Sequence, residues 1–176
     1  MDDLNHELRK TSMSRVRFEA RTCYVPSVDG AIEIGKGDES MTNMLSDWAK
    51  EFLREDRVGV VSTLNNDGSS HLTTMWYLLA DDGTLILSTP AHNQKVKNLR
   101  RDPRIALCVG DVTRSVSLYG TVTISDDQAL IRQDIEHLVE RYVKDAGIRP
   151  QVSATLAQQS RVALHFTAEK VTEFSV

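Results

Sequence analysis

Two hydroxyl side chains, an amide and an ammonium group lie close together between residues 88 and 95. Ser88 and Thr89 end an apolar run that is typical of a β-strand, and Gln94 and Lys95 open a segment typical of a short helix. The first turn of a helix carries backbone N–H groups without partners and a partial positive charge, so anions bind there. Together these groups are suited to hold a phosphate.

A second interpretation of the same stretch stays open. Residues 94–104 hold one acid and five basic residues, which are Lys95, Lys97, Arg100, Arg101 and Arg104. Such a run is more often the solvated face of a helix. Composition alone does not separate the two interpretations.

The second candidate is the run Thr73, Thr74, Met75 and Trp76 on a neighbouring strand. Side chains alternate along a strand, so Thr74 and Trp76 share one face and Thr73 and Met75 share the other. A hydroxyl beside an indole can line a planar ring, although a tryptophan on a strand is more often part of the core. Both interpretations stay open.

The remaining reactive side chains show no pattern that carries chemistry. The five histidines have no metal-ligand spacing, and no serine stands in a nucleophile-elbow motif. Cys23 and Cys108 lie far apart in the chain and are expected to be free thiols. We therefore predict no metal site and name no catalytic side chain.

Composition limits the classes of partner. The chain has 176 residues and a formal net charge of −4, which fits one globular domain and argues against a nucleic-acid partner. It has no apolar run long enough to span a membrane, and its first residues lack the apolar stretch of a secretory signal. We expect a cytoplasmic protein with no membrane partner.

The elements that must position these groups begin near Met41. Residues 1–40 mix charges with sparse apolar residues and are treated as a poorly specified N-terminal extension, whereas residues 41–176 show regular patterning. A stripe of apolar residues at helical spacing predicts a first helix over 43–54. The domain is therefore assigned to residues 41–176.

Alternating apolar residues predict three strands in a meander, over 57–64, 70–79 and 84–89. Their turns are expected at Asn66-Asp67-Gly68 and Asp81-Asp82-Gly83, because Asp-Gly is typical of tight hairpins. The second of these strands carries Thr73–Trp76, and the third ends at Ser88 and Thr89.

The second half of the chain continues with a helix over 94–101, capped by Asn93, and strands over 104–109 and 115–124, with Gly120 as a bulge. A capping box formed by Ser125 and Gln128 opens a helix that buries one apolar face. The last expected elements are a helix near 153–160, a strand over 161–167 and a hairpin partner over 170–174.

Strands joined mostly by hairpins, with helices inserted between them, point to a mainly β fold, an antiparallel barrel with short helices packed outside. A doubly wound fold fits poorly, because helices do not alternate with the strands. The candidate residues are thus expected on the strands and on one short helix of such a barrel.

The order of these motifs resembles the pyridoxamine-phosphate-oxidase-like FMN-binding split-barrel superfamily, over about residues 43–176. The run Gln-Lys-Val-Lys-Asn-Leu-Arg-Arg-Asp-Pro-Arg at 94–104 is the most specific part, and it follows Leu-Ile-Leu-Ser-Thr at 85–89. Within the superfamily, the chain is most similar to the flavin/deazaflavin oxidoreductase B group.

This resemblance implies a six-stranded split barrel that forms a homodimer and binds a flavin-type cofactor at the subunit interface. The chemistry implied is hydride transfer to or from a small conjugated organic substrate, carried by the cofactor. It assigns the cofactor phosphate to Lys95, Ser88, Thr89 and Gln94, the cofactor ring to Thr73, Thr74, Met75 and Trp76, and the contact from the partner chain to Ser115 and Val116.

Two cofactors fit this implication. Coenzyme F-420 carries a phospholactyl-polyglutamate tail and favours a longer basic groove than FMN, which Lys95, Lys97, Arg100 and Arg101 can line. We therefore expect F-420 first and FMN next. Haem or another tetrapyrrole, held by a non-catalytic binding or storage protein of the same fold, is the alternative.

Two departures argue against pyridoxamine phosphate oxidation itself. True pyridoxamine phosphate oxidases have an arginine on the second strand, where this chain has Thr73 and Thr74. They also end in a segment rich in Trp and Arg, whereas this chain ends in residues 169–176 without either.

Overall fold

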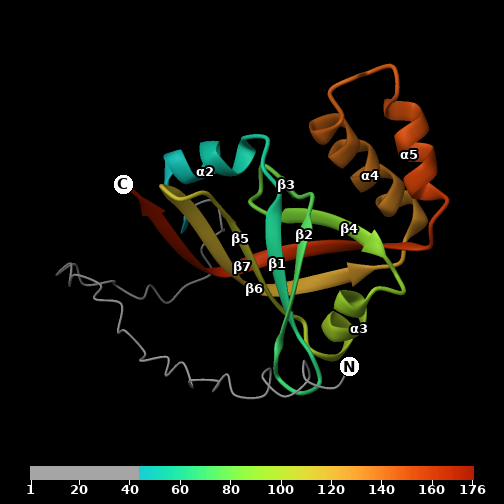
Figure 1. The fold of residues 1–176 in the computed structure, drawn as a ribbon. Helices are drawn as coiled ribbons and strands as arrows, with labels where there is room; N and C mark the ends of the chain where they lie inside the picture. The colour runs from blue at the N-terminus through green and yellow to red at the C-terminus, as the bar shows by residue number, and fades with distance from the viewer. Residues whose placement is uncertain (1–43) are drawn as a thin grey trace, which may run out of the picture. The chain divides into compact units, whose positions relative to one another are not determined.

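A computed structural model describes residues 44–176, so the predictions for residues 1–40, including Cys23, lie outside the described residues. Within 44–176, one antiparallel sheet carries the fold, and its strand order is β2-β1-β5-β6-β7-β4-β3 (Figure 1). The strands are β1 (Gly59–Leu64), β2 (Ser70–Met75), β3 (Leu78–Leu79), β4 (Leu85–Pro90), β5 (Arg104–Gly110), β6 (Arg114–Ser125) and β7 (Arg161–Ser175).

The predicted mainly β, split-barrel fold is confirmed, but the described residues form seven strands rather than six. The extra strand arises because the expected strand over 70–79 breaks at Trp76 and Tyr77. β2 pairs with β1, whereas β3 pairs with β4 at the opposite edge of the sheet. The predicted meander is therefore wrong at its third strand, because β2 and β4 are not neighbours.

The break leaves no mark on the side-chain pattern. Met75, Tyr77 and Leu79 are all buried, so the alternation continues across both strands. The two-residue link joins the two edge strands, and the sheet is closed there by the chain itself rather than by a ladder of hydrogen bonds. The barrel is split between β2 and β3, because these two edge strands are not paired with each other.

Both predicted turns and the predicted bulge are confirmed. Gly68 and Gly83 have φ of 81° and 91°, a left-handed conformation that favours glycine. The register between β6 and β7 shifts between Tyr119 and Gly120. A Cβ at Gly120 would lie 2.1 Å from the carbonyl oxygen of Thr167, so the backbones approach there as only glycine allows.

The end of the chain differs from the expectation. Residues 161–167 and 170–174 were expected as a hairpin, but they form one continuous strand, β7. The connecting residues Ala168 and Glu169 offer no turn chemistry, and they lie opposite the bulge at Gly120. Glu169 is the extra residue of this bulge, so β7 continues through an irregularity where a turn was expected.

Within residues 44–176, four helices flank the sheet, and they are α2 (Asp47–Arg54), α3 (Gln94–Arg101), α4 (Gln128–Tyr142) and α5 (Arg149–Ala157). The helix over 94–101 is confirmed residue for residue. The capping box at Ser125 is wrong, because Asp127 caps α4 and accepts a hydrogen bond from the Ala129 N–H. α5 begins before the expected residue 153, because Pro150 stands in its first turn, where a missing N–H does no harm.

Two apolar clusters hold these elements together. The larger one fills the barrel and includes Phe52 and Leu53 of α2 and Val96 and Leu99 of α3. The smaller one lies on the outer face of the sheet, where Ile131, Ile135 and Val139 of α4 pack on Ala163 of β7. Figure 1 shows α4 and α5 as a pair beside β4 and the start of β7.

Among residues 44–176, no helix is both long enough and apolar enough to cross a membrane.

Candidate functional site

A pocket of about 300 Å³ lies where the end of β4 and the first turn of α3 meet the start of β7 and the helix pair α4–α5. Six of the ten predicted cofactor-binding residues line it, although they come from three segments of the chain. These six are Thr74, Met75, Trp76, Ser88, Thr89 and Lys95. Pro90, Ile135, Leu138, Leu156 and Arg161 complete the wall.

Lys95 is held inside this pocket by the local geometry of β4 and α3. Three residues separate the end of β4 from α3, and Lys95 stands in the first turn of the helix. Its side chain is largely enclosed, with 8% of the residue exposed. The ammonium Nζ lies 3.5 Å from Oγ1 of Thr89, which also accepts a hydrogen bond from the Asn93 amide at 3.0 Å. Lys95 is thus not a solvated helix charge.

The sequence analysis missed Arg161, the first residue of β7. Its Nε donates to Oγ of Ser88 at 3.1 Å, and its Nη2 donates to the carbonyl oxygen of Ser88 at 2.9 Å. Arg161 pairs with Pro90 in the β4–β7 register, which brings it to the end of β4. Only the register between two strands far apart in the sequence reveals this contact, and no local sequence pattern indicates that register.

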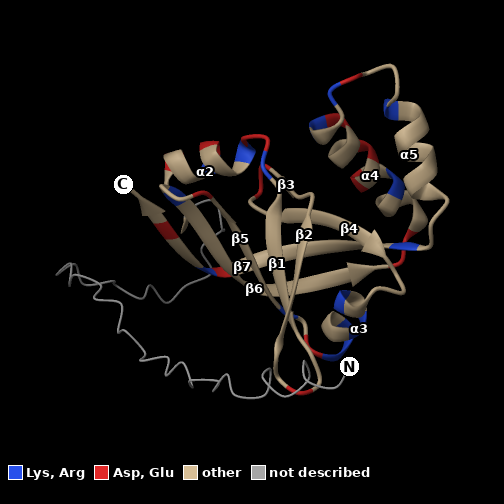
Figure 2. Ribbon diagram, in the orientation of Figure 1, with Lys and Arg blue, Asp and Glu red and all other residues tan. Residues whose placement is uncertain are grey.

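The pocket therefore holds two positive charges without a negative one. Within residues 44–176, neither Lys95 nor Arg161 forms an ion pair with a carboxylate. Burial lowers the pKa of both side chains, and the charge of Arg161 lowers the pKa of Lys95 further. Figure 2 shows Lys and Arg on α3 and at the start of β7. An anion bound near both side chains would stabilise their charged forms and so oppose the lowering of both pKa values.

The opposite wall of the pocket is apolar and aromatic. Trp76 stacks on Tyr142 of α4, with ring centroids 5.0 Å apart and planes 3° from parallel. Ile135, Leu138 and Leu156 come from the helix pair. The predicted alternation is confirmed, because Thr74 and Trp76 face the pocket side of the strand while Tyr77 is fully buried in the barrel.

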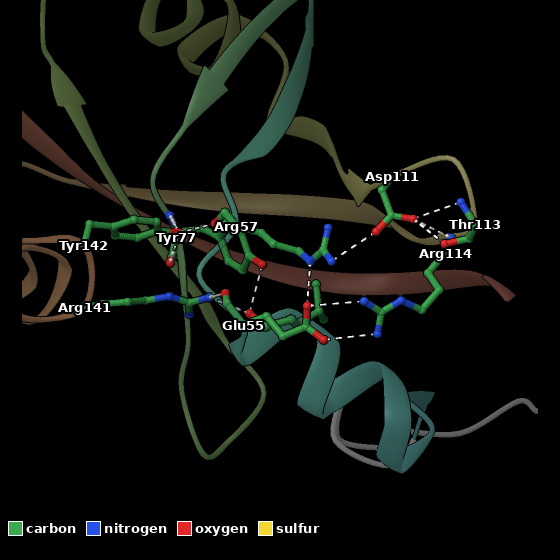
Figure 3. Close-up of polar contacts among 9 residues, drawn as sticks. Glu55, Arg57, Tyr77, Asp111, Thr113, Arg114, Arg141 and Tyr142 are labelled. Carbon is green, nitrogen blue, oxygen red and sulfur yellow. Dashed lines mark hydrogen bonds and ion pairs between the residues drawn. The ribbon is translucent and has the colours of Figure 1, made fainter. Parts of the chain in front are cut away.

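A polar network fixes the end of α4 that carries Tyr142 (Figure 3). The Tyr142 hydroxyl donates to the carbonyl oxygen of Arg57 at 2.6 Å and accepts from the N–H of Tyr77 at 3.2 Å. The neighbouring Arg141 donates to the carbonyl oxygens of Leu53 and Glu55 at 2.6 and 2.7 Å. Since these partners lie at the end of α2, between α2 and β1, and next to β3, the network ties the end of α4 to the barrel beside the stacked pair Trp76–Tyr142.

Four predicted residues do not line the pocket. Gln94 is exposed, and its amide donates to Asn98 at 2.9 Å. The hydroxyl of Thr73 is buried without a hydrogen-bond partner on the barrel side of β2. Ser115 and Val116 pair with Phe174 and Glu173, at the end of β7 remote from Arg161. Val116 has a fully buried side chain, so its backbone alone is available for a contact.

The four cations named for a longer basic groove do not all remain available to a ligand. Arg100 forms an ion pair with Asp126 at 3.0 Å. Arg101 hydrogen-bonds to Asn66 and to the carbonyl oxygen of Leu64. Lys97 is exposed on the surface of α3. Two of the four cations named for a polyanionic tail are therefore engaged elsewhere.

A larger hollow of about 570 Å³ lies between α4 and α5, but no predicted residue lines it. Its ionisable lining residues include both signs of charge, with Arg132 and Arg149 beside Glu136 and Glu140. Among the described residues, no group of three or more His, Cys, Asp and Glu side chains could hold a metal ion. The pocket at Lys95 is thus the site with a chemical preference.

Comparison with known proteins gives a family match over most of the chain. Residues 45–175 match the family model described as pyridoxamine 5'-phosphate oxidase. No curated protein matches the sequence.

Solved structures match in fold. The crystal structure of the conserved hypothetical protein Rv2991 from Mycobacterium tuberculosis has 30% sequence identity and a TM-score of 0.64, covering 74% of this chain and 85% of that one. A structure described as an F-420 reductase has 21% identity and a TM-score of 0.60, covering 73% of this chain and 98% of that one. General Stress Protein 26 from Bacillus anthracis has 16% identity and a TM-score of 0.54, covering 71% and 89%.

Proposed function

Since this chain belongs to the pyridoxamine 5'-phosphate oxidase family, we propose that it is an oxidoreductase that uses a flavin-type cofactor, F-420 or FMN, to transfer hydride to or from a small conjugated organic substrate. The family includes flavin-binding oxidoreductases. The observation that carries the proposal is the pocket lined by a buried lysine, Lys95, and a partly buried arginine, Arg161, with no carboxylate in its lining. Such a pocket fits the phosphate of the cofactor.

The size of the pocket also supports placing the phosphate end of the cofactor there. A volume of about 300 Å³ is at the small end of ligand pockets, so it suits the phosphate end rather than a whole flavin. We assign the phosphate to Lys95, Thr89 and Arg161, and the ring to the strand at Thr74 and Trp76. The cofactor, when bound, supplies the hydride-transfer chemistry.

The protein side chains then bind, orient and exclude water. Thr89 and Lys95 hold the phosphate end, and the stacked pair Trp76–Tyr142 offers an aromatic wall. Ile135 and Leu138 of α4 keep this wall apolar. Oxidation of pyridoxamine phosphate is not part of the proposal, because Thr73 and Thr74 stand where true pyridoxamine phosphate oxidases have an arginine.

We also propose that the protein is a homodimer whose interface includes the outer face of β2, β1, β5 and β6. Leu72, Val60 and Tyr119 are 61%, 39% and 45% exposed. The sheet register places them on one face, because Ser62 pairs with both Leu72 and Ala106, and Ala106 pairs with Tyr119. Large exposed apolar residues gathered on one sheet face are typical of an interface.

The experiment is titration of the purified protein with FMN and with F-420 at the same salt concentration, followed by absorbance and fluorescence. Binding is expected to weaken at least about tenfold in Lys95→Ala, since a charge-assisted contact is lost. Lys97→Ala is the matched control, because Lys97 is exposed on the same helix. Unchanged affinity in Lys95→Ala would overturn the phosphate assignment.

Catalysis is tested separately from binding. The reduced cofactor is mixed with a panel of enones and quinones, with and without protein. The proposal expects faster oxidation of the cofactor with protein for at least one substrate. An equal rate for every substrate would instead favour a binding or storage protein, for which haem is the next ligand to titrate.

A further inference from the structure

Arg161 gives the pocket a second positive charge at the end where the phosphate is proposed to bind. We infer that Arg161 and Lys95 together select a doubly charged phosphate monoester, such as the phosphate of FMN, over a singly charged phosphodiester. This inference rests on the proposed function, since it concerns the same pocket, and it adds the charge of the ligand that the pocket prefers.

The guanidinium of Arg161 is fixed but not saturated. Nε and Nη2 donate to Ser88, and Nη1 donates to the side chain of Gln159 at 2.9 Å. A guanidinium carries five N–H donors, so two are left for a ligand. Because Ser88 holds two of its three nitrogens, the plane of Arg161 is set before any ligand arrives. A preorganised cation loses less freedom when it binds an anion.

Counting charges distinguishes the two kinds of phosphate. Lys95 and Arg161 both line the pocket, and within the described residues no carboxylate balances them. Buried charges are stabilised only when they are paired. A phosphate dianion would neutralise the pair, whereas a monoanion would leave one uncompensated positive charge in the pocket.

The ligands differ in this respect near neutral pH. A phosphate monoester has a second pKa of about 6 and carries close to two negative charges at pH 7. A phosphodiester keeps a single negative charge. FMN ends in a monoester, whereas the phosphate of F-420 joins two groups as a diester. The carboxylates of the F-420 tail would need further cations, and Arg100 and Arg101 are already engaged.

The competing explanation gives Arg161 a structural role only. Its two hydrogen bonds to Ser88 connect the start of β7 with the end of β4, and they would hold these strands together without any ligand. A structural role predicts that removing the guanidinium lowers thermal stability and weakens all flavins alike. A role in charge selection predicts a change in the ratio between two ligands that differ only at the phosphate.

The test uses calorimetric titration with three ligands, which are FMN, the monomethyl ester of FMN and riboflavin. The monomethyl ester keeps the ring and the chain but carries one charge. The wild-type protein is expected to bind FMN at least about tenfold more tightly than the ester. In Arg161→Gln this ratio is expected to fall toward one, while Arg161→Lys retains most of it because the charge remains.

The controls separate this inference from the proposed function. Arg132→Gln removes an exposed arginine of α4 and is expected to keep the wild-type ratio. If the wild-type protein binds no flavin, both the function and the inference fail. If FMN binds but wild-type and Arg161→Gln proteins show the same ratio, or if the wild-type ratio is near one, the inference fails and the function stands. Should Arg161→Gln not fold, Lys95→Gln, which removes the other charge of the pair, takes its place: its ratio is expected to fall toward one, and an unchanged ratio would overturn the inference.

Discussion

Tyr142 is a side chain whose hydroxyl and ring act in different places. The hydroxyl lies between backbone groups of Arg57 and Tyr77, and the ring stacks on Trp76. The first set of contacts is structural, because it ties the end of α4 to the barrel. The second contact, the stacking on Trp76, forms the aromatic wall of the pocket. Substitution can therefore separate stability from cofactor binding.

Tyr142→Phe is expected to lower the free energy of unfolding by about 1–3 kcal/mol, because the backbone groups at Arg57 and Tyr77 lose their partner. The ring stays, so cofactor affinity should change little. Urea denaturation and a cofactor titration measure the two effects. Gln133→Ala, at an exposed position of α4, should stay within about 0.5 kcal/mol. A loss of affinity without a loss of stability would contradict the division of roles.

At the residue scale, the sequence predicts which side chains carry the chemistry of the site better than it predicts which side chains contact one another. Ser88, Thr89 and Lys95 were found because a strand end and a helix start are readable from a short stretch of sequence. Arg161 was not found, because it reaches Ser88 only through the pairing of β4 with β7. The structure places six of the ten predicted residues at the pocket, and the roles of all ten stay predictions.

At the scale of elements, the turn between β5 and β6 shows how one acid organises a connection. Asp111 accepts hydrogen bonds from the N–H of Thr113 at 2.9 Å, from its hydroxyl at 2.8 Å, and from the N–H of Arg114 at 2.9 Å. An ion pair with Arg57 at 3.1 Å joins this turn to the start of β1. Figure 3 shows the turn beside the network at Arg141 and Tyr142.

These contacts predict a loss of stability in acid. The hydrogen bonds from Thr113 and Arg114, with the charge of Arg57, hold the pKa of Asp111 well below its usual range. A lowered pKa contributes stability that is present above the unfolded pKa of about 4 and is lost as the pH falls through the folded pKa. The urea concentration at the unfolding midpoint should therefore decrease as the pH falls below about 4. This decrease should be less steep in Asp111→Asn. Equal slopes for the two proteins would contradict this account.

Elements with local signals were predicted well, and those set by long-range pairing were not. The turns at Gly68 and Gly83 and the helix over 94–101 depend on residues next to one another, and all are confirmed. The break at Trp76 and Tyr77 follows from the pairing of β3 with β4, which no alternation pattern reports. The continuous β7 contains the extra residue Glu169 opposite Gly120 of β6, and this pairing joins strands far apart in the sequence.

At the scale of the whole molecule, the sequence predicted a mainly β split barrel, and the structure confirms that fold for residues 44–176. The hairpin-rich order of strands predicted a mainly β antiparallel barrel, because short connections leave few antiparallel topologies. The family resemblance implied that the barrel is of the split type. The order of the strands in the sheet could not be predicted in the same way, since β7 lies between β6 and β4. The division at residue 41 stays a prediction.

The proposed dimer makes a prediction at this scale. Leu72→Glu places a charge in the proposed apolar interface, where burial without a partner is costly. Light scattering is expected to give twice the chain mass of 19.7 kDa for the wild-type protein and a single chain mass for Leu72→Glu. Val112→Glu, at an exposed turn, is the matched control and should stay dimeric. A wild-type mass near 19.7 kDa would remove the interface from the proposal.

The helix pair α4–α5 leaves the sheet at Ser125 and returns at Arg161, and Ser125 pairs directly with Ala163. The pair is thus an insertion between two adjacent strands that already meet at this point. A short turn could connect β6 to β7 in its place. Yet the helix pair supplies Ile135, Leu138 and Leu156 to the pocket wall, while α3 and β7 supply the two cations. The architecture is modular. In the proposed function, exchanging α4–α5 for another insertion of similar span would change which substrates fit, while Lys95 and Arg161 would stay in place.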